Sequence, residues 1–415
     1  MINSVAASHA VGKSATDTIF AANAAAIKAA AEYGNDAVVN ATLGAFLTED
    51  EKLGFLPTVE KVFRNLPSVE IGGYAPIAGL PEYLNAAIDL TFAEYRPDAY
   101  VDAIATPGGS GVIHHAIWNY TEIGDTVLTA DWFWDPYETM CDDALRKIDT
   151  FVLFDEEQRF NINSFAAKTK ELLVKQNNLL IIINSPANNP TGYSLSNDEW
   201  AAVLASLKEA AKDETKKIIL LVDAAYLDYA GATKEPRSFM KQFGGLPANF
   251  LTVIGFSMSK GYTMYGQRTG AMIGISSSKE VITEFVDINQ YSCRSTWSNV
   301  SRACMRTLAT IYKDKELLAQ VEQERSEYYQ ALRTRADIFI QEAKKVNLTM
   351  LPYVAGFFLT VPAKRPAEVC QALQADNIFA VPMERGIRVA VCAVTARKMK
   401  GMAAKFAKAI AAVEG

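Results

Sequence analysis

The sequence predicts an α/β protein with a large domain, in which a mostly parallel sheet is covered by helices on both faces, and a smaller α/β domain. Between Asp125 and Asp223, apolar strand segments alternate regularly with helical segments. These strands lack a polar face, which indicates a parallel sheet buried on both sides. After about residue 300 the pattern changes to long helices and then to a second group of strands, which is typical of a second, smaller domain.

The composition is that of an ordinary globular enzyme. Of the 415 residues, 50% are hydrophobic and 21% are charged. This length allows two or three domains and a large core. The net charge of −6 and the scattered basic residues argue against a nucleic-acid partner and against a membrane-binding surface.

The cysteines and histidines predict neither a disulfide framework nor a metal site. The five cysteines are widely spaced and form no CxxC pair, which fits a reducing compartment. The three histidines, His9, His114 and His115, have no metal-binding spacing, so histidine-based nucleophilic chemistry is not expected. The sequence has no signal-peptide pattern and no apolar run long enough to span a membrane, and we therefore expect a cytoplasmic protein.

The N-terminal part of the chain is predicted to be helical, with one short strand. An alanine-rich helix ends at Gly34, a strand at 37–43 leads to Gly44, and a further helix follows at 58–65. Tyr74 then lies in a glycine- and proline-rich loop that precedes a helix. A phenol in such a loop is usually a packing residue, although it can also donate a hydrogen bond to a neighbour.

A glycine-rich turn, GGSG at 108–111, separates the end of a strand from an amphipathic helix. At a helix start, the backbone N–H groups and the hydroxyl of Gly109 and Ser110 would favour an anion. The glycine spacing matches neither the Walker loop nor the dinucleotide fingerprint. A simple turn is the alternative interpretation.

The central part of the chain alternates strands and helices. Strands are predicted at 125–130, 148–154, 179–184 and 216–223, and helices within 131–147, 161–176 and 195–213. In such sheets ligands bind beyond the carboxyl ends of the strands. Asn189 follows one of these ends in NSPANNPTG, and Asp223 forms another, with Tyr226 three residues later. A carboxylate that ends a buried strand needs a cationic or hydrogen-bonded partner; a turn cap is the alternative.

Lys260 lies between two apolar strand segments, 250–256 and 269–275. Ser257 precedes it and Arg268 follows it, so hydroxyl and guanidinium groups accompany the amine. This pattern is typical of an anion site with an amine beside it, and a lysine desolvated near another cation readily becomes a neutral nucleophile. A solvent-exposed loop lysine is the alternative interpretation when this stretch is taken alone.

The C-terminal part is predicted to begin with long helices within 301–346. The elements that follow are strands at 356–361, 378–382 and 387–394, a helix at 365–375 and a closing helix to Gly415. Arg388 opens one of the apolar strands. It could pair with a structural carboxylate, or it could bind a substrate carboxylate in a bidentate fork.

Together these motifs resemble the class I aminotransferases, which are pyridoxal-phosphate enzymes of fold type I. The resemblance covers nearly the whole chain in order: YAPIAGL, GGSG, a tryptophan-containing loop, NNPTG, DAAY, SMSK, the arginine eight residues after the lysine, and IRVAV. It implies an N-terminal segment (1–50) that packs with the small domain, a large cofactor-binding domain (51–300) and a small C-terminal domain (301–415).

The resemblance implies a role for each candidate residue. Lys260 would hold pyridoxal phosphate covalently and then move the proton between substrate Cα and the cofactor. Asp223 would pair with the pyridinium nitrogen, while Tyr226 and Asn189 would hydrogen-bond the ring's phenolate oxygen. The groups implied to bind the phosphate are Gly109, Ser110, Ser257 and Arg268. Trp134 would stack on the ring, with Trp132 as the competing choice.

The resemblance also implies a homodimer with shared sites. Tyr74 would reach the cofactor phosphate in the partner subunit. Arg388 would bind the substrate α-carboxylate, near Asn189, and Gly44 lies in the segment that closes over the substrate. Arg294, in CRSTWSN, takes the place of the arginine that binds a distal carboxylate in the partner's site.

The implied reaction is a ping-pong exchange of an amino group between an amino acid and a 2-oxo acid such as 2-oxoglutarate. Aspartate is the favoured donor. Aromatic amino acids are the nearest rival, because enzymes of both kinds can have an arginine at the place of Arg294. The DPY sequence after Trp134, and Asn184, depart from the closest aspartate enzymes. A carbon–sulfur lyase or a decarboxylase could use the same fold. The effector module of a transcription regulator is disfavoured, because the resemblance begins within about the first forty residues.

Overall fold

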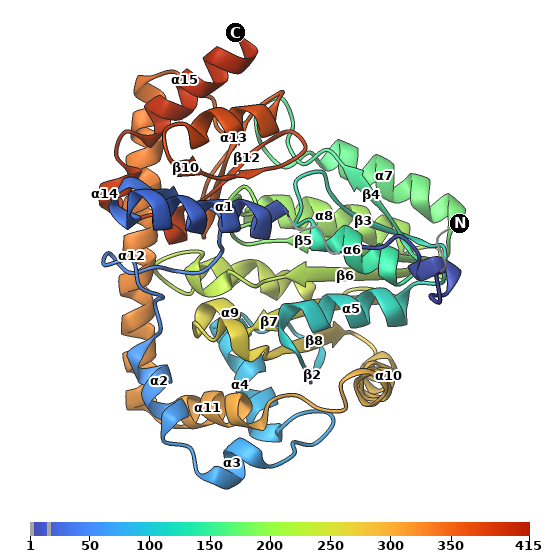
Figure 1. Cartoon of the computed structure of the whole chain (residues 1–415). Coiled ribbons are helices and arrows are strands. Elements are labelled where there is room, and N and C mark those ends of the chain that lie inside the picture. Colours follow the sequence, from blue (N-terminus) through green and yellow to red (C-terminus); the bar gives the residue numbers. More distant parts are fainter. Residues whose placement is uncertain (1–3, 15–17) are drawn as a thin grey trace.

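A seven-stranded sheet forms the centre of the molecule in the computed structural model, which describes residues 4–14 and 18–415 (Figure 1). The strand order is β2-β8-β7-β6-β5-β3-β4. The strands are β2 (Tyr100–Thr106), β3 (Thr126–Ala130), β4 (Lys147–Phe151), β5 (Asn178–Asn184), β6 (Lys217–Asp223), β7 (Phe250–Ser257) and β8 (Gly270–Ser276). All neighbours are parallel except β8, which is antiparallel to both β7 and β2. The predicted α/β class with a mostly parallel sheet is confirmed.

The reversal between β7 and β8 goes with a connection that lacks a crossover helix. A parallel return would need a crossover of a dozen or more residues, usually with a helix that packs back on the sheet. Here the connection from Met258 to Thr269 contains only one helical turn, α9 (Met258–Gly261), and a short 3₁₀ turn, η6 (Tyr265–Gln267), so no helix packs back across the sheet. The chain therefore turns back at the carboxyl edge of the sheet, and Lys260 is held in that turn.

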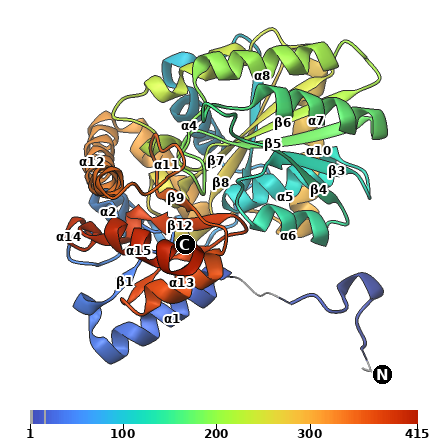
Figure 2. The ribbon, with the colours of Figure 1, turned by 90° about the horizontal axis from the view of Figure 1, so that it is seen from above.

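Smaller sheets lie on the C-terminal side of the molecule. The strands are β1 (Val39–Asn40) and β10 (Ile378–Phe379), which pair in parallel, and β11 (Val381–Pro382), β12 (Gly386–Ala390) and β9 (Phe358–Pro362), which form an antiparallel sheet. Figure 2 shows α1 (Thr18–Tyr33) beside these elements, where Ala26, Ala29 and Val38 pack with Phe379. The N-terminal segment and the C-terminal part thus share a small core.

Several boundaries differ from the sequence prediction. The segment expected as one strand at 378–382 is split at Ala380 into two short strands that belong to different sheets. The strand expected at 37–43 is only Val39–Asn40, and the strand that begins before Arg388 ends at Ala390 and continues as a 3₁₀ turn. The expected turn GGSG is already the first turn of α5, because that helix begins at Gly108. Apolar patterning locates buried segments but not where their pairing stops.

Helices cover both faces of the large sheet, and a 31-residue helix, α12, runs along one side of the molecule (Figure 1). The remaining helices are α2 (Pro57–Arg64), α3 (Ser68–Gly72), α4 (Pro81–Phe92), α5 (Gly108–Tyr120), α6 (Pro136–Asp143), α7 (Ile162–Lys175), α8 (Asn197–Ala210), α10 (Lys279–Thr296), α11 (Arg302–Lys313), α13 (Pro366–Gln374), α14 (Ala396–Met399) and α15 (Met402–Glu414), and α12 itself is Lys315–Lys345. Among the helices described, none is long and apolar enough to cross a membrane.

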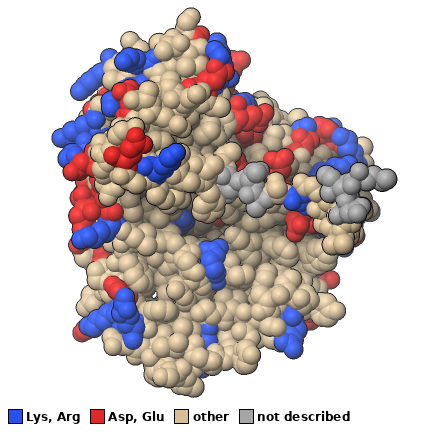
Figure 3. Space-filling view, viewed as in Figure 1, with Lys and Arg blue, Asp and Glu red and all other residues tan. Residues whose placement is uncertain are grey.

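Charged side chains are distributed unevenly on the face shown in Figure 3. Acidic and basic groups are interspersed over the upper part of this face, and they are fewer over its lower half. Within the described ranges, no group of His, Cys, Asp and Glu side chains could hold a metal ion. The five cysteines are all buried free thiols.

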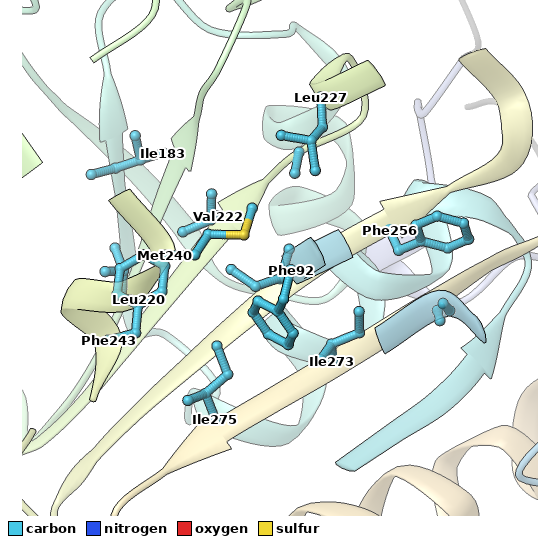
Figure 4. Packing of buried hydrophobic residues seen from close by; sticks show 14 of the residues in the cluster. Phe92, Ile183, Leu220, Val222, Leu227, Met240, Phe243, Phe256, Ile273 and Ile275 are labelled. Atoms are coloured by element: carbon cyan, nitrogen blue, oxygen red, sulfur yellow. The ribbon is translucent and has the colours of Figure 1, made fainter. Parts of the chain in front are cut away.

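Alternating side chains of the large sheet supply two separate cores. Leu179, Ile181 and Ile183 pack with α4, α7 and α8, whereas Leu180 and Ile182 pack with α5, α6 and α10 on the opposite face. Figure 4 shows part of the first core, where side chains of β6, β7 and β8 meet those of α4 and of the 3₁₀ segment η5 (Glu235–Phe243). Because both faces are covered, the polar residues at the carboxyl ends of these strands are held by a rigid support.

A buried ionic cluster ties α12 to the segments that follow β6, beside Gly261 in the turn that holds Lys260. Asp228 Oδ1 lies 2.6 Å from Nη2 of Arg237 and 2.9 Å from Nη1 of Arg325, which belongs to α12. Burial alone would raise the pKa of Asp228, but the two guanidinium groups lower it below its ordinary value. A Cβ atom at Gly261 would collide with this carboxylate. The cluster therefore fixes the turn next to Lys260.

We expect Asp228→Asn to lower the free energy of unfolding by about 3–5 kcal/mol, because two buried guanidinium groups would lose their carboxylate. Urea denaturation of the purified protein measures this change. Glu60→Gln is the matched control, because Glu60 pairs with Arg64 on the exposed side of α2 at 2.7 Å, and its loss should cost no more than about 0.5 kcal/mol. Equal effects of the two substitutions would show that the cluster is not a structural anchor.

Candidate active site

A cavity of about 360 Å³ opens at the carboxyl edge of the large sheet. Its walls come from the N-terminal segment, the strand ends of the large sheet and the C-terminal strands. The sequence-predicted residues that line it are Gly44, Gly109, Ser110, Trp134, Asn189, Asp223, Tyr226, Ser257, Lys260, Arg268 and Arg388. The structure therefore brings together residues that are far apart in the sequence.

Lys260 lies in the cavity as a buried amine. Its Nζ donates a hydrogen bond to the carbonyl oxygen of Gly44 and lies 5.0 Å from the ring centre of Tyr265 and 5.7 Å from that of Tyr226. Burial lowers the pKa of Lys260 to about 8, and the positive charges of Arg388 and Arg268 act in the same direction. About a tenth of this amine is therefore neutral, and nucleophilic, at pH 7, far more than for an ordinary lysine.

Asp223 ends β6 and is held from both sides. The phenol of Tyr137 donates to its Oδ2 at 2.5 Å, and the backbone N–H of Ala225 donates to its Oδ1 at 3.2 Å. The side-chain amide of Asn184 donates to the Asp223 carbonyl at 2.8 Å. Burial raises the pKa of Asp223, while the hydrogen bond from Tyr137 acts against that rise.

Tyr137 was not singled out by sequence analysis. Its segment, DPY, stood out only as a departure from the aspartate enzymes, and its partner Asp223 is 86 residues away in the sequence. The available signal was positional: Tyr137 lies in the first turn of α6, after the carboxyl end of β3 and three residues beyond Trp134. That edge of the sheet is where ligand-binding side chains gather.

Arg388, Asn189 and Tyr226 form a polar group on the side of the cavity nearest the C-terminal strands. Arg388 donates from Nη1 to Asn189 Oδ1 at 3.3 Å and from Nη2 to the Thr42 carbonyl at 2.8 Å. The Phe358 ring lies 4.4 Å from the guanidinium carbon of Arg388. Burial raises the pKa of Tyr226, and Arg388 and the hydrogen bond with Asn189 oppose that rise.

A second set of groups forms an anion-binding site. Arg268 donates from Nη1 to Ser259 Oγ at 3.1 Å, and its Nη2 lies 3.5 Å from Ser110 Oγ at the start of α5. A Cβ atom at Gly108, whose φ is +70°, would lie 2.8 Å from Nη2 of Arg268, so glycine permits this close approach. N–H groups at a helix start, hydroxyls and a guanidinium together favour a phosphate.

Some predicted residues lie outside this cavity. The Tyr74 side chain is 89% exposed, and Arg294, at the end of α10, donates to Ser298 Oγ at 3.0 Å on the surface. Of the two competing tryptophans, Trp134 lines the cavity, whereas Trp132 is buried beside Arg385, whose guanidinium carbon lies 5.1 Å from its ring centre.

This arrangement of an amine, a carboxylate and an anion site on an α/β sheet defines a cofactor-dependent group-transfer enzyme. The chain belongs to the class I and II aminotransferase family, whose model matches residues 37–406. It is similar to the aromatic-amino-acid aminotransferase of Escherichia coli K12, with 26% identity over 330 residues that cover 76% of this chain and 77% of that protein. The cytoplasmic aspartate aminotransferase of Dictyostelium discoideum is 22% identical over 286 residues, which cover 68% of this chain and 63% of that protein.

Solved aminotransferase structures share the fold of this chain. An aminotransferase from Anaerococcus prevotii superposes with a TM-score of 0.96 at 39% identity, covering 98% of this chain and 100% of that chain. The aromatic-amino-acid aminotransferase of Burkholderia pseudomallei, covalently bound to pyridoxal phosphate, superposes with a TM-score of 0.80 at 21% identity, covering 97% and 98%. The predicted resemblance is confirmed, and the protein is a pyridoxal-phosphate-dependent aminotransferase.

The residues of the cavity fit this cofactor. Pyridoxal phosphate carries a dianionic phosphate, a basic ring nitrogen and an aldehyde that reacts with amines. The cavity supplies an anion site at Arg268, a buried carboxylate at Asp223 and a buried amine at Lys260. Each functional group of the cofactor thus has a group of complementary chemistry in one cavity.

We expect the Lys260 amine of the apoprotein to be acylated with a pH midpoint near 8. The neutral, reactive fraction grows as pH rises through the folded pKa, well before an ordinary lysine at 10.5 would react. Competitive labelling with acetic anhydride, read by mass spectrometry, gives the midpoint.

Two arginine variants test the cause of the lowered midpoint. Arg268→Met removes a nearby positive charge and should raise the midpoint, whereas Arg385→Met, which removes an exposed partner of Asp131, should leave it unchanged. A wild-type midpoint near 10.5 would contradict the buried position of the amine.

Proposed function

We propose that the protein transfers the amino group of aspartate to a 2-oxo acid such as 2-oxoglutarate by a ping-pong mechanism. The observation that carries the proposal is the meeting of Lys260, Asp223 and Arg388 in one cavity, where the amine has a lowered pKa. An amine that is easily deprotonated can react with the cofactor and later move a proton. A buried arginine can bind the carboxylate that all amino acids and 2-oxo acids share.

Each residue that would hold the cofactor has a physical role. Bound pyridoxal phosphate supplies an electron sink for the bond broken at the substrate Cα. The Asp223 carboxylate keeps the ring nitrogen protonated, and Tyr226 and Asn189 donate hydrogen bonds toward the ring's phenolate oxygen. Trp134 covers a ring face. The residues that hold the phosphate are Gly109, Ser110, Ser257 and Arg268.

The Lys260 amine performs the proton transfer. With its lowered pKa, the Lys260 amine would take the proton from the substrate Cα and deliver it to the cofactor's aldehyde carbon, C4′. Arg388 holds the α-carboxylate in a fork, so that the Cα–H bond faces Lys260. The Gly44 segment, whose carbonyl accepts the Lys260 hydrogen bond, closes the cavity over the substrate and excludes water.

Aromatic amino acids are the second candidate donors, and the rest of the cavity wall favours them. Ile19, Phe20 and Ile113 add apolar side chains to this wall. An apolar wall accommodates a phenyl ring at no desolvation cost, whereas a second carboxylate needs a cationic partner. The E. coli and B. pseudomallei relatives are named for aromatic amino acids. Aspartate specificity therefore depends on a cation from outside this chain's own cavity.

We propose that Arg294 of a second copy supplies this cation, and that the enzyme is a homodimer with shared sites. Arg294 and Tyr74 both lie outside the cavity of their own chain, and exposed apolar side chains accompany them: Val69, Ile71, Ile77 and Tyr291. The lower half of the face in Figure 3, over α3 and α10, carries few charges. Such a surface is suited to burial against a partner.

Two further proposals concern organisation and location. We propose a division into an N-terminal segment (1–50) that packs with the small domain, a large cofactor-binding domain (51–300) and a small domain (301–415), supported by the separate core around β9 and β12. We also propose that the enzyme acts in the cytoplasm, as the name of the Dictyostelium relative states for that protein.

Arg294→Leu tests the donor. We expect kcat/KM for aspartate to fall about 100-fold, because a buried carboxylate would lose its charged partner, and kcat/KM for phenylalanine to change less than about threefold. Stopped-flow absorbance of the donor half-reaction measures both values.

The exposed arginine variant Arg64→Leu is the control and should change neither value. A wild-type enzyme that uses phenylalanine far faster than aspartate would favour the aromatic alternative. Lys260→Ala should be inactive with both donors, and activity retained by this variant with either donor would contradict the mechanism itself.

A hybrid dimer tests the shared site. One subunit carries Lys260→Ala and the other carries Arg294→Leu, and the two are purified with different tags. If Arg294 serves the neighbouring subunit, one site of the hybrid contains both wild-type residues, so about half of the wild-type activity with aspartate should return. If Arg294 serves its own subunit, or if no dimer forms, the hybrid should stay as inactive as the parent variants.

A further inference from the structure

Tyr137 contacts two of the cavity residues but has no role in the mechanism above. It lies in the first turn of α6 and is completely buried. Its hydroxyl donates to Asp223 Oδ2 at 2.5 Å. Its ring meets Trp134 edge to face, with ring centres 5.7 Å apart and an angle of 86° between the planes. One side chain thus contacts both the carboxylate and the indole that face the cavity.

The hydrogen bond to Asp223 is needed because of burial. A carboxylate removed from water stays ionised only if donors or cations replace its hydration. The Asp223 carboxylate oxygens receive the 3.2 Å hydrogen bond from Ala225 N–H and the shorter one from Tyr137. Lys260 is the cationic side chain whose charge also acts on this carboxylate. The phenol is therefore the strongest neutral donor to this carboxylate.

We propose that Tyr137 is a positioning residue that orients the Asp223 carboxylate toward the cofactor's ring nitrogen and fixes Trp134 against the ring. The inference rests on the proposed roles of Asp223 and Trp134. In this proposal the Tyr137 hydroxyl affects cofactor binding only by holding the Asp223 carboxylate. The Tyr137 ring supports the indole of Trp134. The hydroxyl is absent in Tyr137→Phe, which keeps the ring.

The alternative is a purely structural role for Tyr137. A comparison of two ligands, one that can pair with Asp223 and one that cannot, distinguishes the two roles. The probes are pyridoxal phosphate and its analogue in which a CH group replaces the ring nitrogen. The analogue keeps the phosphate, the aldehyde and the ring face but cannot pair with Asp223. A hydroxyl that acts through Asp223 matters for the first ligand and not for the second.

The experiment measures the dissociation constants of both ligands for the apoproteins by fluorescence quenching. Tyr137→Phe should bind pyridoxal phosphate at least about tenfold more weakly, as expected for a lost hydrogen bond to a charged group, and should bind the analogue within about twofold of wild type. Tyr193→Phe is the matched control, because its hydroxyl also donates to a carboxylate, Glu199, at 2.5 Å but lies outside the cavity. It should leave both constants unchanged, and the thermal midpoints of the apoproteins report any general loss of stability.

The outcomes separate the inference from the proposed function. If Tyr137→Phe weakens the binding of both ligands equally, or of neither, the proposed positioning role of the Tyr137 hydroxyl is wrong. Asp223→Asn tests the proposed pairing of Asp223 with the ring nitrogen. It should weaken the binding of pyridoxal phosphate and leave the binding of the analogue little changed. If Asp223→Asn shows no such selectivity, the proposed role of Asp223 fails. If it shows the selectivity and Tyr137→Phe does not, only the inference about Tyr137 fails.

Discussion

The burial of an amine and a carboxylate at the same edge of one sheet is the constraint on which the rest of the structure depends. Each charge loses hydration that water would supply, and the two pKa values move in opposite directions: that of Lys260 falls to about 8 and that of Asp223 rises. Donors and acceptors recruited from distant segments limit this cost, namely the Gly44 carbonyl for the amine and the Tyr137 phenol for the carboxylate. The apolar cores on both faces of the sheet keep these partners in place.

Topology brings these distant segments to one place. The tight return from β7 to β8 places Lys260 at the carboxyl edge, next to the end of β6 with Asp223. The N-terminal segment and the C-terminal strands then close the other side, because Arg388 of β12 donates to the carbonyl of Thr42 at 2.8 Å. Thr42 is only two residues from Gly44, so the contact that holds the arginine also positions the segment that receives the Lys260 hydrogen bond. Amine, carboxylate and arginine are thus held by one connected set of contacts.

The sequence was sufficient for those parts of the structure that local pattern determines. Strands buried on both faces, such as β5 to β7, were predicted to within a residue or two, since a short, continuous apolar run between turn residues is typical of a buried strand. The direction of β8 was not predictable from its side chains, which are the same in a parallel or an antiparallel strand. Most of the motif residues line one cavity, whereas Tyr74 and Arg294 lie outside it. Tyr137 was missed because its importance comes from a long-range contact with Asp223 and not from its neighbours in sequence.

The excess of cationic side chains in the cavity suits both an anionic cofactor and substrates that carry a carboxylate. Its lining contains three cationic side chains, Lys260, Arg268 and Arg388, and one carboxylate, Asp223, although the chain as a whole has a net charge of −6. The positive potential that attracts anions is therefore local to the cavity, where these side chains are buried. A bound phosphate dianion would offset the charge of Arg268 beside Lys260, while the charge of Arg388, on the side of the C-terminal strands, would still act on a carboxylate. Cofactor binding would thus leave one strong cation in the cavity, and a buried guanidinium of this kind favours ligands that carry a carboxylate.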